Sequence, residues 1–354
     1  MDLSFYNGKT VLITGHTGFK GAWLAKILVQ SGAKVVGYAL TPPTEPNLFD
    51  MSGLAGQITS VIGDIRDYAK LHETFEKYKP EIVFHLCAQA IVLNSYMAPR
   101  ETYEINTMGT VNLLECVRSV GGVRSLLVVT TDKVYAELAE DRPFVENDRL
   151  NGYDPYSNSK SCAELIVSCY KRSFLSDLGV AVSAMRAGNC IGGGDFGAYR
   201  LVPDMVRALM SNAPLLVRTP NSVRPWESVF DALSAYLLVA EKQYKNINFA
   251  GEYNVGPSEQ NLVSTIELVQ ALNDNFKKFG AGVQIQTCKV QVGKEMGKLT
   301  ISPNKIKNTF GFTGKWDISQ TLAQTAEFTR IMLADKKQVP AEMERQIKLY
   351  FGDK

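Results

Sequence analysis

The chain has 354 residues, of which 45% are hydrophobic and 21% are charged, as in ordinary globular proteins. This composition excludes a disordered, collagen-like or fibrous chain, and the length suits one large or two modest domains. The 38 Lys and Arg residues against 36 Asp and Glu residues leave a net charge of +2, without a basic stripe that would favour nucleic-acid binding. No apolar run reaches the roughly 18 residues that a membrane span needs.

The six cysteines are scattered along the chain and none forms a CxxC pair. Most lie in apolar surroundings, which indicates buried, reduced thiols in a reducing compartment. The three histidines are distant from the cysteines in the sequence, so a zinc site is not expected. The N-terminal sequence MDLSFYNGKTV lacks a basic stretch followed by an apolar core and is typical of a mature protein. We therefore expect a soluble cytoplasmic protein.

Short apolar runs of strand length alternate with amphipathic stretches over the first half of the chain. Strands are predicted at residues 10–14, 34–40, 60–62, 81–86 and 125–130. Helices are predicted at residues 21–31, 68–78, 101–119 and 156–176. Strands this apolar are covered on both faces, and their alternation with helices implies parallel strands joined by right-handed crossovers. The predicted fold class is therefore α/β, with a Rossmann-type doubly wound parallel sheet.

The alternation loosens after Arg186. Residues 192–195 (GGGD) are predicted as a loop, and residues 283–292 alternate like a strand. Further helices are predicted at residues 201–212, 229–243 and 317–348. We expect a Rossmann domain at residues 1–186, to which the chain returns around residues 226–256. A smaller mixed α/β substrate domain would then comprise residues 187–225 and 257–354.

A glycine-rich loop, GHTGFKG at residues 15–21, follows the first predicted strand and leads into a helix. Gly15 permits a tight turn, Gly18 lets the backbone approach a pyrophosphate, and Gly21 lets the helix pack on the strand. The N-terminus of the helix offers free N–H groups and a partial positive charge to phosphates. A purely structural turn is the alternative, but the position between the first strand and the first helix favours a dinucleotide site.

The acid that usually binds the adenosine ribose is missing, because residues 38–43 read YALTPP. No carboxylate is present there to reject the 2′-phosphate of NADP, and no arginine is present to bind it, so the sequence favours NAD. Asp64, which follows the third predicted strand, could accept a hydrogen bond from the adenine amino group. A helix N-cap or turn residue is an equally consistent interpretation of Asp64.

Two groups of residues are candidates for chemistry. Tyr156 and Lys160 are four residues apart on one face of a predicted helix, where a nearby ammonium would make the phenol a usable general base. Thr131, Asp132 and Lys133 follow the fifth predicted strand, at the edge where doubly wound sheets bind ligands. An adjacent acid and base at that edge predict catalysis; a solvated loop in which Asp132 caps a helix is the alternative.

The chain resembles the extended short-chain dehydrogenase/reductases and, among them, the CDP-glucose 4,6-dehydratases. The strings that carry the resemblance are GHTGFKGAWLA (15–25), YALTPPTEPNLF (38–49), GDIRD (63–67), PEIVFHLCAQA (80–90), TTDKVY (130–135), GYDPYSNSK (152–160), MRAGNCIGGGDF (185–196), RLVPD (200–204) and SVRPWESV (222–229). Residues 5–260 match well, and the remainder matches loosely.

The resemblance implies a lyase that uses NAD to convert CDP-D-glucose into CDP-4-keto-6-deoxy-D-glucose. Tyr156 would take the proton of the C4 hydroxyl as a hydride leaves C4 for NAD, and Thr131 would bind the C4 oxygen. A base would then remove the C5 proton while Asp132 protonates the departing C6 hydroxyl, and the hydride would return to C6. Lys133, where relatives acting on dTDP sugars carry Glu, is either the C5 base or a binding residue only.

The resemblance also implies a set of binding residues. Those for the cofactor are Gly15, Thr17, Gly18, Phe19, Gly21, Asp64, Ile65, Leu86, Ala88, Tyr156 and Lys160. Those for the substrate are Thr131, Asn189, Arg200 and Arg224, with Arg224 on the diphosphate. Asn189 is equally consistent with a loop-capping amide. Arg200 and Arg218 are better explained as solvated surface charges, and Trp226 as a packing residue.

The chain departs from the family pattern around the expected sugar pocket. Asn94 replaces an arginine, and the loop after Tyr135 (AELAEDRPFVEND) lacks an Asn and a Glu-Trp pair. Ser228 replaces a histidine, and residues 293–301 (GKEMGKLTI) lack a His-Glu pair. These changes bear on which sugar nucleotide is bound more than on oxidation at C4.

The family context further implies a homodimer, deoxysugar biosynthesis for O-antigen, and no nucleic-acid or membrane partner. The helix pair would dimerise through Leu113, Leu114 and Val117 on one helix and Leu165, Ile166 and Cys169 on the other, although these faces could equally belong to the core. A nucleotide-sugar epimerase of the same superfamily and a non-catalytic dinucleotide-binding protein remain alternative functions.

Overall fold

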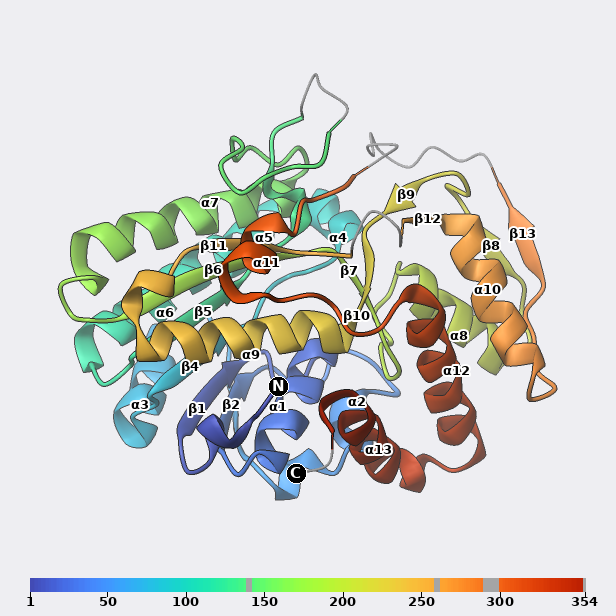
Figure 1. Ribbon diagram of the computed structural model, residues 1–354, viewed down its shortest axis with the longest axis horizontal. Helices are drawn as coiled ribbons and strands as arrows, with labels where there is room; N and C mark the ends of the chain where they lie inside the picture. Colours follow the sequence, from blue (N-terminus) through green and yellow to red (C-terminus); the bar gives the residue numbers. More distant parts are fainter. Residues whose placement is uncertain (138–141, 258–261, 289–298, 353–354) are drawn as a thin grey trace.

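A seven-stranded parallel sheet lies at the centre of the computed structural model, which describes residues 1–137, 142–257, 262–288 and 299–352 (Figure 1). The strand order is β11-β6-β5-β4-β1-β2-β3, and every pair of neighbours runs parallel. The strands are β1 (Thr10–Thr14), β2 (Lys34–Ala39), β3 (Thr59–Ile62), β4 (Ile82–His85), β5 (Ser125–Val129), β6 (Ala181–Ala187) and β11 (Glu252–Val255). The predicted fold class and the five predicted strands of the first half are confirmed.

Helices cover both faces of this sheet, which explains why its strands are apolar on both sides. Alternate strand residues point to opposite faces, so Ile13 packs on one side and Leu12 on the other. The first side is covered by α1 (Phe19–Gln30) and α9 (Val229–Lys245). The second is covered by α3 (Tyr68–Tyr78), α6 (Gly109–Val120) and α7 (Pro155–Tyr170). These helices confirm the predictions at 21–31, 68–78 and 229–243 to within two residues at each end.

The two long predicted helices are each interrupted by a wider turn. The segment predicted at 101–119 comprises α5 (Pro99–Tyr103), a π-helical turn (Glu104–Met108) and α6. The segment predicted at 156–176 comprises α7 and a π-helical turn (Lys171–Leu175). Within the first, Leu113, Leu114 and Val117 are fully buried against the sheet, so the core interpretation holds for these three residues. On α7, by contrast, Leu165 is 58% exposed and Cys169 is also exposed.

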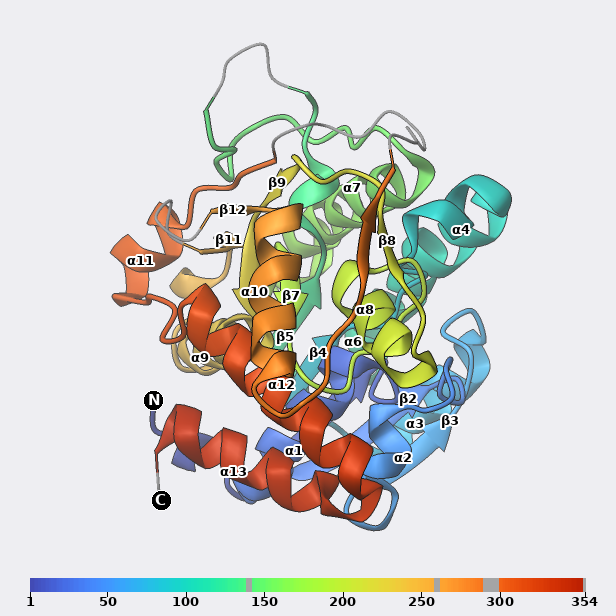
Figure 2. The same ribbon diagram turned by 90° about the vertical axis from the view of Figure 1, so that its right-hand side faces the viewer.

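The rest of the chain forms a smaller group of helices and short strands beside the sheet, at the right of Figure 1 and facing the viewer in Figure 2. Its strands form the pairs β7–β10, β9–β12 and β8–β13. Their bounds are β7 (Asn189–Ile191), β8 (Leu215–Val217), β9 (Val223–Arg224), β10 (Trp226–Ser228), β12 (Val263–Ser264) and β13 (Ile285–Thr287). The strand predicted at 283–292 is shorter than expected, and residues 289–292 lie outside the described part of the chain.

The helices of this group are α8 (Leu201–Ser211), α10 (Thr265–Lys277) and α12 (Ile318–Ala334). Helix α11 (Asn304–Phe310) instead lies against β11, and α13 (Val339–Phe351) lies against α1. Two short helices, α2 (Leu48–Met51) and α4 (Val92–Met97), lie nearer the sheet. The helix predicted at 201–212 is confirmed, and the helical tail at 317–348 divides into α12 and α13. Helix α10 was not predicted, although Ser264 and Glu267 form a complete capping box at its start.

The two C-terminal helices close over the first helix of the chain. Trp23 of α1 is fully buried, packs against Phe328 of α12 with ring centroids 6.0 Å apart, and donates a hydrogen bond to the carbonyl of Gly193. Lys26 of α1 pairs with Glu344 of α13 at 2.9 Å. The C-terminal segment, whose sequence resembles the family only loosely, therefore completes the core around the helix that follows the glycine loop.

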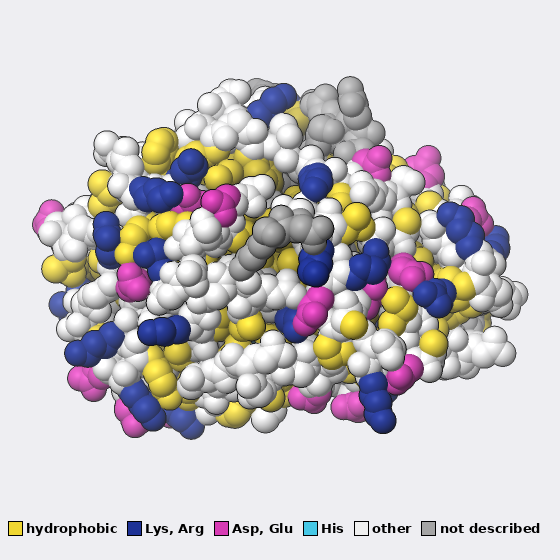
Figure 3. Space-filling view, turned by 60° about the horizontal axis from the view of Figure 1, so that its bottom comes forward, with side chains coloured by type: hydrophobic (Ala, Val, Ile, Leu, Met, Phe, Trp, Pro, Cys, Tyr) yellow, Lys and Arg dark blue, Asp and Glu magenta, His cyan; other side chains and the backbone are white. Residues whose placement is uncertain are grey.

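Among the described residues, no helix combines the length and the apolar character needed to cross a bilayer. On the face shown in Figure 3, basic and acidic side chains are interspersed.

Candidate active site

The glycine loop connects the end of β1 to α1, as predicted. Gly15 has a φ of +82°, and a Cβ there would lie 2.9 Å from the backbone nitrogen of Cys87. A Cβ on Gly21 would lie 2.1 Å from the carbonyl oxygen of Gly15, so the close packing of helix and loop requires glycine at both positions. A Cβ on Gly18 would meet only that same carbonyl oxygen among the described atoms, at 3.4 Å. The fold itself therefore tolerates a side chain at residue 18.

The open space at Gly18 lies at the N-terminus of α1, where Gly18 is the N-cap and no side chain caps the helix. Unsatisfied backbone N–H groups and the helix dipole make such a position suitable for an anionic group such as a pyrophosphate. This arrangement supports the prediction that the loop binds a dinucleotide.

The other predicted cofactor residues each have their own contacts in the structure. Thr17 donates from Oγ1 to the carbonyl of Leu40 at 2.9 Å. The Asp64 carboxylate accepts a hydrogen bond from the backbone nitrogen of Arg66 at 2.9 Å and pairs with the Arg66 guanidinium at 2.6 Å. Hydrogen bonding to the Arg66 side chain lowers the pKa of the Asp64 carboxyl. Asp67, rather than Asp64, is the N-cap of α3.

Three more of the predicted cofactor residues are apolar. Ile65 follows β3, and Leu86 and Ala88 follow β4. Ile65 is 2% exposed and lies against Gly109, where a Cβ would come within 2.6 Å of its side chain. Leu86 continues from the end of β4 with a backbone hydrogen bond to Thr14, and Ala88 follows it half-buried. Together with Asp64 they place apolar surface and one carboxylate beside the carboxyl ends of the first strands.

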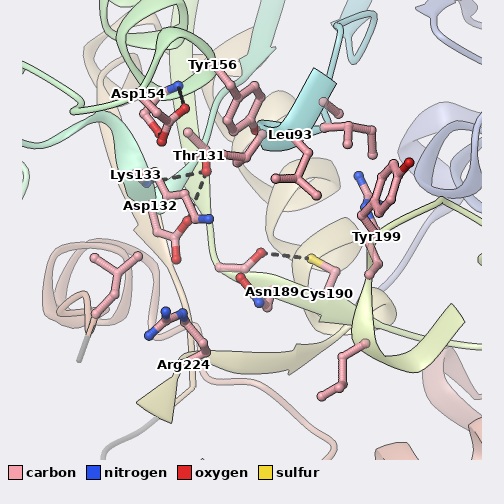
Figure 4. A pocket seen from close by; sticks show the side chains of 18 of the residues that line it. Leu93, Thr131, Asp132, Lys133, Asp154, Tyr156, Asn189, Cys190, Tyr199 and Arg224 are labelled. Carbon is pink, nitrogen blue, oxygen red and sulfur yellow. Dashed lines mark hydrogen bonds between the residues drawn. The ribbon is translucent and has the colours of Figure 1, made fainter. Parts of the chain in front are cut away.

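The residues after β5 form a compact turn at the carboxyl edge of the sheet (Figure 4). Thr131 accepts from the backbone nitrogen of Lys133 at 3.4 Å and donates from Oγ1 to Asp132 Oδ1 at 2.9 Å. Asp132 is 2% exposed, and its Oδ2 has no hydrogen-bond partner among the described residues. Burial raises the pKa of Asp132, because the charged form loses its hydration, so the side chain is suited to hold a proton.

Tyr156 lies in the first turn of α7, which is fixed by its N-cap. Asp154 accepts from the backbone nitrogen of Ser157 at 2.9 Å and from its hydroxyl at 2.6 Å. Burial raises the pKa of the Tyr156 phenol, whereas hydrogen bonding to Thr131 acts in the opposite direction. The turn after β5 and the start of α7 therefore bring Thr131, Asp132 and Tyr156 together, as the sequence predicted.

Lys160 lies one helical turn beyond Tyr156 but points toward the sheet. Its ammonium donates to the carbonyl of Val129 at 2.9 Å, and its side chain is 4% exposed. Burial lowers the pKa of Lys160 to about 8. The Lys160 ammonium is thus held at the end of β5, next to the turn that contains Thr131 and Asp132.

A cavity of about 890 Å³ opens over these residues. The predicted residues that line it are Phe19, Thr131, Asp132, Lys133, Tyr156, Asn189, Arg200 and Arg224. Arg218 and Trp226 also line it. Arg200 pairs with Asp195 at 3.2 Å, and Arg224 is 7% exposed, so Arg224 is a buried cation rather than a surface one. Lys160 and the glycines of the loop do not line this cavity.

Several lining residues were not singled out from the sequence. They include Lys20, Tyr153, Asp154, Cys190, Asp195, Tyr199 and, around α4, residues 90–93, 96 and 97. Buried Glu227 lies beside them, bonded to Gly188 and Cys190. The sequence could have pointed to two of these residues. Lys20 lies within the glycine loop and Glu227 lies in the string RPWESV, and both strings carry the family resemblance.

The positions at which this sequence departs from the family pattern lie at or near the cavity wall. Asn94 lines it from α4, and Glu137 lines it from the loop after Tyr135, whose residues 138–141 lie outside the described part. Ser228 accepts from the backbone nitrogen of Phe230 at 3.1 Å and so caps α9. Of residues 293–301, positions 293–298 also lie outside the described part, and Leu299 lines the cavity.

The cysteines are free thiols, and the described residues contain no group of three or more His, Cys, Asp or Glu side chains that could hold a metal ion.

Known proteins resemble this chain in sequence and in fold. A sequence profile for the family described as GDP-mannose 4,6 dehydratase matches residues 12–325. CDP-glucose 4,6-dehydratase of Salmonella typhimurium is 39% identical over 93% of this chain and 92% of its own length. A UDP-glucose 4-epimerase of Thermus thermophilus in complex with NAD has a TM-score of 0.77 and 25% identity, covering 91% of this chain and 99% of its own. The dTDP-glucose 4,6-dehydratase of Bacillus anthracis, also solved with NAD, shares the fold at a TM-score of 0.75 and 24% identity, covering 91% and 97%.

Proposed function

The chain belongs to the GDP-mannose 4,6-dehydratase family, and on that premise we propose that it is a hydro-lyase converting CDP-D-glucose into CDP-4-keto-6-deoxy-D-glucose with NAD. The observation that carries the proposal is the presence of Tyr156 and Asp132 in one cavity, where burial raises the pKa of the Asp132 carboxyl. An enzyme that only oxidises C4 needs the tyrosine as its base. Expulsion of a hydroxyl from C6 requires an acid as well.

NAD fits the loop after β1, where the open side of Gly18 and the uncapped N-terminus of α1 would hold its pyrophosphate. Thr17, Phe19, Asp64, Ile65, Leu86 and Ala88 would complete its binding site. When bound, NAD supplies a two-electron acceptor that takes a hydride from C4 and returns it to C6. Lys160, whose ammonium donates to the carbonyl of Val129, would also contribute to this cofactor site.

The chain's own residues handle the protons. Tyr156 takes the proton of the C4 hydroxyl as the C4 ketone forms, and Thr131 orients the C4 oxygen. Lys133 takes the C5 proton, which the ketone acidifies. Asp132 gives its proton to the C6 hydroxyl, so the C6–oxygen bond breaks and water leaves. Lys133, whose ammonium protons exchange with solvent, gives a proton back to C5 in the last step, and the proton held by Tyr156 returns to Asp132 through solvent.

Arg224 and Arg200 would bind the diphosphate, and Asn189 would hydrogen-bond the sugar side of the substrate. Arg224 is the more strongly supported of the two arginines, because its side chain is buried at the cavity wall. A fixed guanidinium loses little conformational freedom when it binds phosphate oxygens.

The test is to incubate the purified protein with CDP-glucose in deuterated water, with UDP-, dTDP- and GDP-sugars as comparators. The proposal predicts loss of water and one deuterium at C5 of the CDP product. Tyr156→Phe is the matched inactive control. Inversion at C4 without water loss would identify an epimerase. Retention of NAD without turnover on any sugar nucleotide would identify a non-catalytic dinucleotide-binding protein.

We further propose a division of labour along the chain. Residues 1–186, with the return at 226–256 that includes β11, would bind NAD. Residues 187–225 and 257–354 would bind the sugar nucleotide. The pairing of β11 with β6 supports the return of the chain to the sheet.

A homodimer through α5, α6 and α7 is also proposed. Leu165 and Phe174 are 58% and 42% exposed, and Met108 is 51% exposed, so apolar side chains remain on the outer side of these helices. Leu165→Glu would shift the protein from dimer to monomer in light scattering. An unchanged mass would contradict this interface.

The cellular setting proposed is the cytoplasm, with the product entering deoxysugar biosynthesis for O-antigen. The free thiols support a reducing compartment. Cell fractionation with antibody detection would test the location.

A further inference from the structure

The wall of the cavity formed by α8 and β8 has no role in the chemistry described above. These two elements pack side by side, as Figures 1 and 2 show. The wall residues come from the first turn of α8 and from β8 and its end, and they are Leu201, Val202, Pro203, Asp204, Leu216 and Arg218. The wall therefore combines apolar surface, including a Leu216 side chain that is 52% exposed, with one carboxylate and one guanidinium.

An elongated sugar nucleotide would bring its base to this wall. In the proposed function, Tyr156 and Asp132 act on the sugar and Arg224 binds the diphosphate. Arg224 lies in β9, which the chain enters from β8 through a turn closed by a hydrogen bond from the backbone nitrogen of Ser222 to the carbonyl of Thr219 at 3.2 Å. The wall at β8 therefore adjoins the position of the diphosphate and contains none of the residues that act on the sugar.

Cytosine differs from uracil and thymine in the group on ring carbon 4. Cytosine has an amine there, which donates hydrogen bonds, whereas uracil and thymine have a carbonyl, which accepts them. A carboxylate only accepts hydrogen bonds, so it pairs with the amine and leaves the carbonyl without a donor. A site that prefers CDP to UDP or dTDP therefore needs a carboxylate with a free oxygen at the base.

Most carboxyl groups of the cavity are already engaged. The carboxyl side chains that line it are Asp132, Glu137, Asp154, Asp195 and Asp204. Asp132 is needed at C6, and Glu137 continues from the turn that contains Asp132. Both oxygens of Asp154 accept from Ser157. Asp195 is occupied in the same way, because Oδ1 accepts from the backbone nitrogen of Gly197 at 2.9 Å and Oδ2 accepts from Arg200 at 3.2 Å.

Asp204 differs from these groups because only one of its oxygens is engaged. Arg207, one turn later in α8, donates from Nη2 to Asp204 Oδ1. The Arg207 guanidinium is itself fixed by hydrogen bonds to the carbonyls of Phe196 at 2.8 Å and Gly197 at 3.1 Å. Within the described part of the chain no hydrogen bond reaches Asp204 Oδ2, and the side chain is 34% exposed. Asp204 lines the cavity, so this oxygen is available to a ligand there.

The two arginines beside Asp204 favour its charged form. Burial raises the pKa of the Asp204 carboxyl, whereas the hydrogen bond from Arg207 and the charges of Arg207 and Arg218 lower it. The ion pair with Arg207 also fixes which oxygen is engaged, since the guanidinium is anchored on two backbone carbonyls. The acceptor is thus held in place before a ligand arrives, and little conformational freedom is lost on binding.

We propose that Asp204 selects the nucleobase, with its Oδ2 accepting a hydrogen bond from the exocyclic amine of cytosine while Leu216 packs against the ring. This inference rests on the proposed function and assigns its preference for CDP-sugars to one side chain. A uracil or thymine base would place its carbonyl oxygen against the carboxylate, where both groups are acceptors and neither is satisfied.

The test measures binding of CDP and UDP, which carry no sugar and cannot react. Calorimetry on the protein in the presence of NAD, at pH 8 so that the carboxyl is ionised, gives both dissociation constants. The wild type is expected to bind CDP about tenfold more tightly than UDP. In Asp204→Asn the Arg207 guanidinium retains the amide oxygen, so the amide NH2 takes the place of Oδ2. CDP should then bind about tenfold more weakly and UDP more tightly, which reverses the preference.

Two further variants separate recognition of the base from a general disturbance of the cavity. Asp195→Asn alters another carboxylate of the cavity wall. Both affinities can change in this control because Arg200 loses its charged partner, but their ratio should stay that of the wild type. Asp204→Leu offers neither an acceptor nor a donor, so the ratio should fall to about one, and it serves if Asp204→Asn does not fold. Equal effects of the Asp204 substitutions on CDP and UDP would overturn the proposal.

Turnover distinguishes this inference from the proposed function. A reversed preference for CDP and UDP in Asp204→Asn, in a protein whose wild type dehydrates no sugar nucleotide, would support the role of Asp204 and refute the proposed function. Dehydration of CDP-glucose by both proteins, with the same ratio of kcat/KM for CDP-glucose and UDP-glucose, would support the function and refute the role of Asp204.

Discussion

Arg186 of β6 and Glu164 of α7 form a buried ion pair, with Nη2 2.5 Å from Oε2 and side chains 3% and 2% exposed. The same carboxylate accepts from the hydroxyl of Thr130 at 2.6 Å, at the end of β5. The helix that carries Tyr156 is thereby tied to both strands whose ends border the cavity. The position of the phenol depends on this pair as well as on the local cap of α7.

Glu164→Ala is therefore expected to destabilise the protein by about 3–5 kcal/mol, because it leaves the Arg186 guanidinium buried without its partner. Chemical denaturation measures the loss. The control is Lys245→Ala, which removes an exposed ammonium paired with Glu241 and should change stability little. Equal effects of the two substitutions would show that the buried pair contributes no more than a surface pair.

Asp132→Asn is expected to slow water elimination about 100-fold or more while oxidation at C4 continues. Asparagine keeps the shape and the acceptor for Thr131 but has no acidic proton to give to the C6 hydroxyl. Stopped-flow absorbance of NADH during one turnover measures the two steps separately. The assignment is wrong if C4 oxidation fails as severely as elimination.

The pH dependence of elimination follows from the same carboxyl. Burial raises the pKa of Asp132, so the acid keeps its proton above the range of an ordinary aspartic acid. Elimination requires the protonated form, and its rate should therefore fall as the pH rises through that raised pKa. Rapid-quench measurements across a pH series would show this limb in the wild type, and Asp132→Asn should abolish it.

Lys133→Met is expected to slow elimination more than the initial oxidation, because methionine retains the length of the side chain but cannot accept the C5 proton. Single-turnover measurements in deuterated water follow both steps, with deuterium at C5 marking the proton exchange. Unimpaired deuterium incorporation would mean that Lys133 only binds substrate and that another group removes the proton.

Alanine is expected to have different effects at two glycines of the loop, Gly21 and Gly18. Gly21→Ala places a Cβ 2.1 Å from the carbonyl oxygen of Gly15 and should cost about 1–3 kcal/mol of stability. Gly18→Ala meets that oxygen at 3.4 Å and should remain within about 1 kcal/mol of the wild type, while it weakens NAD binding. Thermal unfolding and calorimetric NAD titration measure the two effects. If Gly18→Ala binds NAD normally, the pyrophosphate lies elsewhere.

Much of the fold could be predicted because local pattern and architecture agree. The apolar run at residues 10–14, followed by Gly15, predicts a buried strand that ends in a tight turn. Parallel strands place their carboxyl ends at one edge, which is why Asp132 and Tyr156, distant in sequence, could be expected to meet.

The contact between Cys190 and Glu227 could not be predicted in the same way. It depends on the pairing of β7 with β10, two strands of only three residues each, which are too short to show a periodicity in the sequence. The faces of α6 and α7 illustrate a second limit. Amphipathic spacing alone does not distinguish Leu113, which packs on the sheet, from Leu165, which remains exposed.

The closure of α12 and α13 over α1 has a consequence for synthesis of the chain. The glycine loop and the first five strands are synthesised early. Trp23 can pack against Phe328, and Lys26 can pair with Glu344, only when nearly all of the described chain has been made. A nascent intermediate should therefore expose an indole and an unpaired ammonium on its first helix. Such a surface would attract chaperones, and the dinucleotide site should mature only after translation has passed these C-terminal helices.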